Sequence, residues 1–213
     1  MIQTLSKNWL LLALCGVFEA IIAAAYLIMQ ETNRPLTFYS WNGTITLIGK
    51  LTLAAGACAI IAGIARSASG KCWFLVLNGL ALAALGIIQY AFIRYPISLL
   101  TVALLIVVMA IGIGIVELQV ARTLRRQRHV MDGGLFAVAG VASACFALTF
   151  VALGFRWIKI EPGSHMDLLL FASYFGFSAI CMLAMALRLR TQGFSQSRGA
   201  PVLPPLGNPR HAH

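Results

Sequence analysis

The stretch from residue 99 to residue 116 reads LLTVALLIVVMAIGIGIV and contains no charged residue. A helix needs about 20 apolar residues to cross the ~30 Å hydrocarbon core of a bilayer. A membrane barrel strand alternates apolar and polar residues over about 10 positions, and this stretch does not alternate. The stretch therefore predicts a membrane-spanning helix rather than a barrel strand.

Five further segments have the same character. Together the six predicted spans cover residues 9–29, 44–65, 72–93, 97–120, 133–155 and 168–187. The composition of the 213-residue chain agrees, because 60% of its residues are hydrophobic and only 10% are charged. Soluble domains carry about 25% charged residues, and disordered chains are poor in apolar residues. We therefore predict an all-α polytopic membrane protein with six transmembrane helices.

The basic residues predict the orientation of these spans. The net charge of +10 does not indicate a nucleic-acid partner, because the basic residues lie between apolar segments and not on a soluble face. Lysine and arginine gather in cytoplasmic loops of membrane proteins. With a cytoplasmic N-terminus, eleven of them fall on the cytoplasmic side, one (Lys50) lies within a span, and four lie on the opposite side: Arg34, Arg94, Arg156 and Lys159. Both termini are therefore predicted to be cytoplasmic.

Both ends of the chain need interpretation. Lys7, the apolar segment after it and Ala23-Ala24-Ala25 resemble a cleavable signal peptide. We favour a retained span, because apolar character continues to Met29 and the segment belongs to a repeat. Residues 191–213 are rich in proline, glycine and serine, a composition that cannot build a packed core. They are predicted to form a disordered cytoplasmic tail after a transmembrane domain of residues 1–190.

The spans repeat internally. Residues 16–23 (GVFEAIIA) align with residues 79–86 (GLALAALG) and 140–147 (GVASACFA), at offsets of 63 and 61. This repetition predicts three helical hairpins within one domain, at residues 9–65, 72–120 and 133–187. Helices in lipid associate through close packing across small residues. We expect six glycines to carry such packing: Gly16, Gly56, Gly79, Gly86, Gly112 and Gly140.

Two acidic residues, Glu19 and Glu117, and one basic residue, Lys50, lie within the predicted spans. Glu19 is at the midpoint of the first, and Lys50 lies about one turn into the second. An intramembrane charge costs at least ~2.5 kcal/mol. Glu19 and Lys50 are therefore a candidate intramembrane charged pair, while the alternatives are a protonated Glu19 with Lys50 reaching outward or a functional proton-titrating group. Glu117 should face other helices, and a local pair with Arg122 near the cytoplasmic boundary is the secondary candidate.

The remaining polar residues give weaker signals. Asn78, Gln89 and Ser143 are candidates for hydrogen bonds between helices. The five cysteines all fall in apolar spans without a Cys-x-x-Cys pair, so we interpret them as small packing residues. Glu161, His165 and Asp167 share an outer loop, which we interpret as solvated rather than as a metal site. No catalytic motif is present, and we expect no enzyme activity, no cofactor and no metal.

Several motifs resemble one family. They are residues 73–79 (WFLVLNG), Gly86, residues 91–98 (AFIRYPIS) and the closing pair Ala121-Arg122. With the six-span layout, they resemble the HdeD family of acid-resistance membrane proteins, which are built from a short duplicated transmembrane repeat. The resemblance covers residues 9–190 and is best in the middle hairpin. Lys50 stands where an apolar or aromatic residue is expected, and the outer loops of the first and third hairpins are longer.

The resemblance implies a bacterial inner-membrane protein linked to survival at low pH, with no catalytic site to carry over. We therefore predict a non-enzymatic role in membrane or acid-stress protection, in contact with the lipid bilayer; the sequence leaves open a homo-oligomer or a membrane-protein partner. The alternative is a small transporter or proton-conducting protein that uses Glu19 and Lys50. Transporters break their helices near the midplane. No predicted span has an internal proline, which favours the first function.

Overall fold

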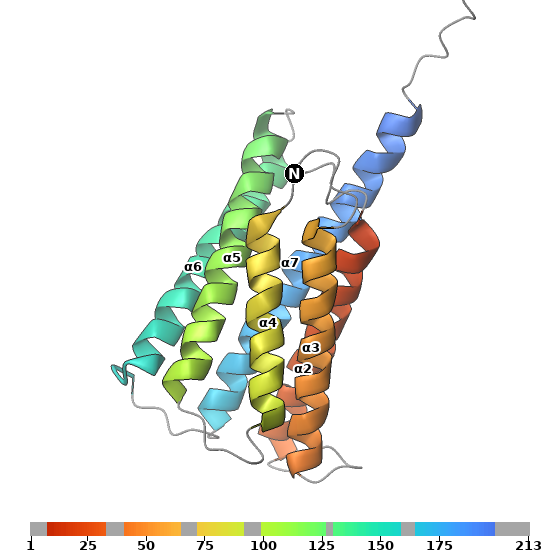
Figure 1. Cartoon of the computed structure of the whole chain (residues 1–213). Coiled ribbons are helices and arrows are strands. Elements are labelled where there is room, and N and C mark those ends of the chain that lie inside the picture. Colours follow the sequence, from red (N-terminus) through yellow and green to blue (C-terminus); the bar gives the residue numbers. More distant parts are fainter. Residues whose placement is uncertain are drawn as a thin grey trace, which may run out of the picture.

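The computed structural model describes residues 8–32, 41–64, 72–91, 99–126, 130–158 and 165–198. In this part of the chain six helices run up and down in alternation (Figure 1). They are α2 (Trp9–Thr32), α3 (Trp41–Ile64), α4 (Trp73–Ala91), α5 (Leu99–Arg126), α6 (Val130–Gly154) and α7 (His165–Arg198). All six are long and apolar enough to cross a membrane. The prediction of an all-α polytopic membrane protein is confirmed.

Two helices extend well beyond their predicted spans. α5 continues to Arg126 and α7 to Arg198, whereas the spans were expected to end at residues 120 and 187. Once a helix is formed, adding a residue costs far less than starting a new helix, and the first proline after α7 is Pro201. Residues 191–198 are therefore helical, where a disordered tail was expected. Residues 199–213 lie outside the described part.

The closest helix packing joins helices of different predicted hairpins rather than the two helices of one hairpin. The most extensive contacts are those of α3 with α4, α5 with α6 and α2 with α7. The contacts of α2 with α3 and of α4 with α5 are less extensive, and α6 and α7 are not among the closely packed pairs. The core is therefore built by three pairs of helices, and the two helices of each pair come from different predicted hairpins.

Glycines allow these pairs to approach closely. A Cβ atom added to Gly56 would lie 2.7 Å from the carbonyl oxygen of Gly79, and one added to Gly79 would lie 2.7 Å from that of Gly56. Gly86 meets the carbonyl oxygen of Gly49 at the same 2.7 Å. The other predicted packing glycines also lie against a neighbouring helix: Gly16 against α7, Gly112 against α4 and Gly140 against α5.

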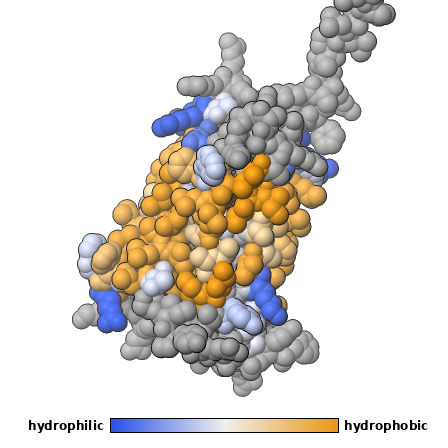
Figure 2. Space-filling view, in the orientation of Figure 1, coloured by the Kyte–Doolittle hydropathy of each residue, from blue (hydrophilic) through white to orange (hydrophobic). Residues whose placement is uncertain are grey.

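The outside of the bundle matches a bilayer. A band of apolar side chains covers the middle of the face seen in Figure 2, with hydrophilic side chains toward its two ends. Trp73 and Trp157, at opposite ends of the bundle, are 64% and 75% exposed. Tryptophan is enriched at membrane interfaces, where its ring lies at headgroup level. Both observations fit helices that cross the membrane.

The first apolar segment is part of the bundle. α2 packs closely against α7 and also contacts α3. Just before the helix, the Asn8 side-chain amide donates a hydrogen bond to the carbonyl oxygen of Ala62 at 3.1 Å. α2 begins, and α7 ends, at the same end of the bundle (Figure 1).

Candidate functional site: a buried carboxyl cluster

Glu19 is fully buried in the interior of the bundle. The Cys15 thiol donates a hydrogen bond to its Oε1 atom at 3.7 Å. The Ser178 side chain of α7 also interacts with the carboxyl group, although Glu19 Oε2 and Ser178 Oγ lack a hydrogen bond of good geometry. Glu19 lies ten residues after Trp9, or about 15 Å along the helix axis.

Glu117 is buried in the same half of the bundle, and its side chain is 0% exposed. The Ser143 hydroxyl of α6 donates a hydrogen bond to Glu117 Oε2 at 2.9 Å, and the Cys181 thiol of α7 interacts with the carboxyl group. Glu117 is eight residues from Arg125, or about 12 Å along α5. Since α2 starts and α5 ends at the same end of the bundle, the two carboxyl groups lie at similar depths.

Side chains of α7 connect the two carboxyl groups. Tyr174, Ser178 and Cys181 follow one another at spacings of four and three residues, which places them on one helix face. Tyr174 lies within electrostatic reach of both Glu19 and Glu117, and so does Cys181. We call Glu19, Glu117, Ser143, Tyr174, Ser178 and Cys181 the carboxyl cluster.

The structure does not join Glu19 to Lys50. Glu19 has no exposed surface, whereas the Lys50 side chain is exposed. Gly49, one residue earlier, faces α4, and the next residue of a helix points about 100° away from its neighbour. Lys50 is therefore turned out of the helix interface. The exposed Lys50 side chain agrees with the part of the second interpretation in which Lys50 reaches away from Glu19.

Glu117 and Arg122 are not paired either. Arg122 is exposed and Glu117 is buried. Helix residues meet at spacings of three or four, and the spacing of five places these two on different faces. Glu117 also lies deeper than expected, because α5 continues to Arg126. Among the described residues, no lysine or arginine contributes to the surroundings of either carboxyl group.

The cluster can accommodate both protonation states of a carboxyl group. A hydroxyl group can donate a hydrogen bond to a carboxylate or accept one from a protonated carboxyl. Four buried oxygen atoms of the cluster have no hydrogen-bond partner among the described residues: Glu19 Oε2, Glu117 Oε1, Tyr174 Oη and Ser178 Oγ. Buried polar atoms are normally paired, and ionisable groups inside the membrane mark functional sites by default. The cluster is therefore the candidate functional site.

A second polar group lies nearer the opposite end of the bundle. The Thr52 hydroxyl lies 3.2 Å from the Gln89 Oε1 atom, and the Gln89 amide donates a hydrogen bond to the Tyr26 hydroxyl at 2.9 Å. The expected bonds between helices are thus found for Gln89 and Ser143. The side-chain amide atoms of Asn78 have no partner in the described part of the chain.

An aromatic layer lies between the two polar groups, and it includes one tyrosine of each group, Tyr26 and Tyr174. The Tyr26 ring stacks on Phe171 and Phe175 of α7, with ring centroids 5.5 and 6.1 Å apart. Phe150 of α6 contacts Phe171 at 5.7 Å and Tyr174 at 5.8 Å. These rings fill the core on the side of the carboxyl cluster that faces the start of α7. Between Tyr26 and Tyr174 the ring contacts run through Phe150, Phe171 and Phe175, whose side chains cannot exchange protons.

The cysteines and the outer loop add no further site among the described residues. Cys15, Cys72 and Cys181 are buried, and all five cysteines are free. No group of three metal-ligating side chains occurs in the described ranges. Glu161 and the side chain of His165 lie outside these ranges. Asp167 was expected in a solvated loop, but it is buried in the first turn of α7, because the helix begins earlier than the predicted span.

The sequence interpretation missed the residues of α7. The signal that could have found them is the set of three polar or polarisable side chains at positions 174, 178 and 181 within an apolar helix, on one face.

Comparisons with protein-family models, with curated proteins and with solved structures found no match for this chain.

Proposed function

We propose that this integral membrane protein protects the membrane under acid stress without enzymatic chemistry, and that the carboxyl cluster is its proton-binding site. The observation that carries the proposal is the pair of fully buried glutamates at similar depths, with no described lysine or arginine beside them. Each proton that binds there removes a charge from an apolar interior, where an unpaired charge is costly. Protonation therefore changes how stably the helices pack around the cluster.

The resemblance to HdeD proteins supports the same role, and on the same ground we propose that the chain lies in the bacterial inner membrane. We further propose cytoplasmic termini. Exposed arginines at the end of the bundle where α2 begins support this orientation; among the described side chains they include Arg122, Arg125, Arg188 and Arg190. In this orientation the carboxyl cluster lies in the cytoplasmic half of the membrane.

A proton-binding role fits the structure better than proton conduction does. Conduction needs a chain of proton-exchanging groups across the membrane, and phenylalanine rings lie between Tyr174 of the carboxyl cluster and Tyr26 of the Thr52–Gln89–Tyr26 group. Lys50, the second residue of the conducting alternative, is exposed and does not lie beside the buried Glu19.

The proposed function is tested by acid survival of bacterial cells that produce equal membrane amounts of wild type, E19Q/E117Q or E31Q. Glu31 also lies on α2, twelve residues after Glu19 and next to the last residue of the helix, so E31Q controls for loss of a glutamate. We expect E19Q/E117Q to survive about as poorly as cells without the protein, and E31Q to survive like wild type. Equal survival of wild type and E19Q/E117Q would contradict the proposal.

Proton flux into proteoliposomes after an external pH drop separates proton binding from conduction. We expect wild-type flux to equal that of empty liposomes. Flux above that level that disappears in E19Q would instead assign a conducting role to the cluster.

A further inference from the structure

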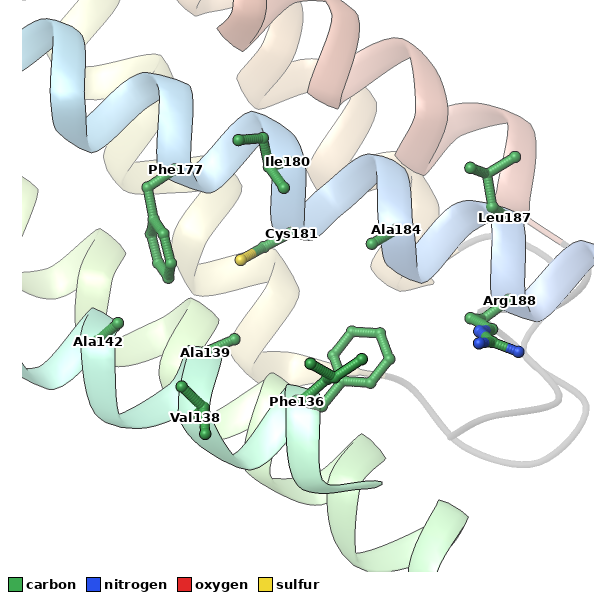
Figure 3. Close-up of a pocket in the computed structure, with 11 residues that line it drawn as sticks. Phe136, Val138, Ala139, Ala142, Phe177, Ile180, Cys181, Ala184, Leu187 and Arg188 are labelled. Atoms are coloured by element: carbon green, nitrogen blue, oxygen red, sulfur yellow. The ribbon is translucent and has the colours of Figure 1, made fainter. Parts of the chain in front are cut away.

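A groove lies between α6 and α7, the neighbouring helices that do not pack closely. It has a volume of about 510 Å³, which is within the range of small-molecule sites, roughly 300–1,000 Å³. Apart from Arg188, its walls are formed by apolar residues of the two helices, among them Val138, Ala139, Phe177, Ile180 and Ala184 (Figure 3). We call it the α6–α7 groove.

Side-chain size explains where the two helices separate. Toward the start of α7, aromatic rings fill the space between them, with Phe146 5.7 Å from Tyr174 and 5.4 Å from Phe177 between ring centroids. Beyond Phe177 the facing side chains include Ala139 and Ala184, which are too small to bridge the gap. The groove therefore follows directly after the aromatic contacts.

The rim of the groove faces the bilayer. Leu135, Val138 and Ile180 are each 69–70% exposed, and they belong to helices that cross the membrane. Exposed apolar side chains at this depth contact lipid rather than water. The occupant should therefore come from the surrounding bilayer.

The length of the groove matches one leaflet. Phe177 and Arg188 are 11 residues apart, which is about 17 Å of helix, or roughly half of a ~30 Å hydrocarbon core. Arg188 is 22 residues after Met166, where the α7 span begins, and about 33 Å along the helix. The arginine is thus placed at headgroup level, and the apolar walls extend from it toward the middle of the membrane.

We propose that the α6–α7 groove binds one acyl chain of an anionic phospholipid, with the lipid phosphate against Arg188. Arginine pairs with phosphate through charged, often bidentate, hydrogen bonds, and basic sites between membrane helices bind anionic headgroups. The single charged lining residue, Arg188, thus complements the headgroup, and the apolar walls complement the acyl chain.

The groove lies beside the carboxyl cluster. Because Cys181 lines the groove and also interacts with Glu117, the bound acyl chain covers the carboxyl cluster from the bilayer side. The proposal does not depend on proton binding by that cluster.

The test is native mass spectrometry of the purified full chain, titrated with phosphatidylglycerol or with phosphatidylcholine of the same acyl chains. We expect phosphatidylglycerol to bind about fivefold more tightly, the factor that corresponds to about 1 kcal/mol per basic residue. R188Q should remove this preference. The matched control is R190Q on the same helix, because the Arg190 guanidinium lies 5.1 Å from the Trp9 ring and does not line the groove.

A second variant tests the apolar walls. A139F places a ring in the groove and should lower the binding of both lipids, whereas L148F adds a ring to α6 at an exposed position, 69% accessible, outside the groove. If A139F does not fold, A184F replaces it. Equal binding of the two lipids by wild type, or an R188Q variant that behaves like R190Q, would overturn the proposal. A139F that leaves lipid binding intact but changes the dimer fraction would also overturn it, and would make the groove an interface between copies.

Discussion

Replacing Gly56 or Gly79 with alanine is expected to destabilise the bundle by about 1–3 kcal/mol, the cost of overpacking a close contact. Each added methyl group would lie 2.7 Å from a backbone oxygen of the facing helix. Backbone atoms cannot rotate away as a side chain does, so α3 and α4 must separate. The unfolding equilibrium in mixed detergent micelles, followed by circular dichroism, measures the loss.

Gly134 provides the matched control. A Cβ atom added there meets nothing within 4 Å, so G134A should gain roughly 0.5–1 kcal/mol from the better helix propensity of alanine. The double variant G56A/G79A should cost less than the two single costs together, because one separation of the helices admits both methyl groups. Equal stabilities for G56A and G134A would show that α3 and α4 do not pack through these glycines.

Raising the pH from acidic to alkaline is expected to destabilise the wild-type protein more than it destabilises E19Q/E117Q. The charged form of each carboxyl group predominates at high pH. An unpaired charge inside the membrane costs at least ~2.5 kcal/mol on insertion scales. Glutamine keeps the shape of the side chain and cannot ionise. The stability that depends on the cluster is therefore present at low pH and lost as the pH rises.

This dependence is measured by thermal unfolding in lipid nanodiscs across the pH range. Other titrating groups contribute to both proteins, so the difference between wild type and E19Q/E117Q isolates the two carboxyl groups. Each single variant should remove part of the difference. Parallel pH profiles for wild type and E19Q/E117Q would show that neither glutamate changes its charge in the folded protein.

The fold was predictable because it depends on local sequence properties. Apolar runs of about 20 residues specify membrane helices, and the spans of all six helices were predicted close to their observed positions. The six packing glycines were predicted because close helix contacts in lipid require small residues. The helix ends were less accurate for α5 and α7, since polar residues extended helices that were already formed.

The site was only half predictable. Glu19 and Glu117 stand out because acidic residues are costly in apolar spans. Their partners depend on which helices touch, and the sequence repeats suggested hairpins, whereas the closest contacts of α2 are with α7. Ser178 and Tyr174 therefore replace Lys50 beside Glu19. Glu117 meets Ser143 of α6 at 2.9 Å because α5 and α6 form another of the close pairs.

The central claim is that Glu19 and Glu117 bind and release protons inside the folded bundle. Infrared difference spectroscopy of the protein in bilayers measures this directly, through the C=O stretching band of protonated carboxyl groups. The account predicts a band that grows as the pH falls, weakens in E19Q and in E117Q, and weakens most in E19Q/E117Q, which keeps the four other acidic residues of the chain. A band that does not respond to pH, or that persists unchanged in E19Q/E117Q, would contradict it.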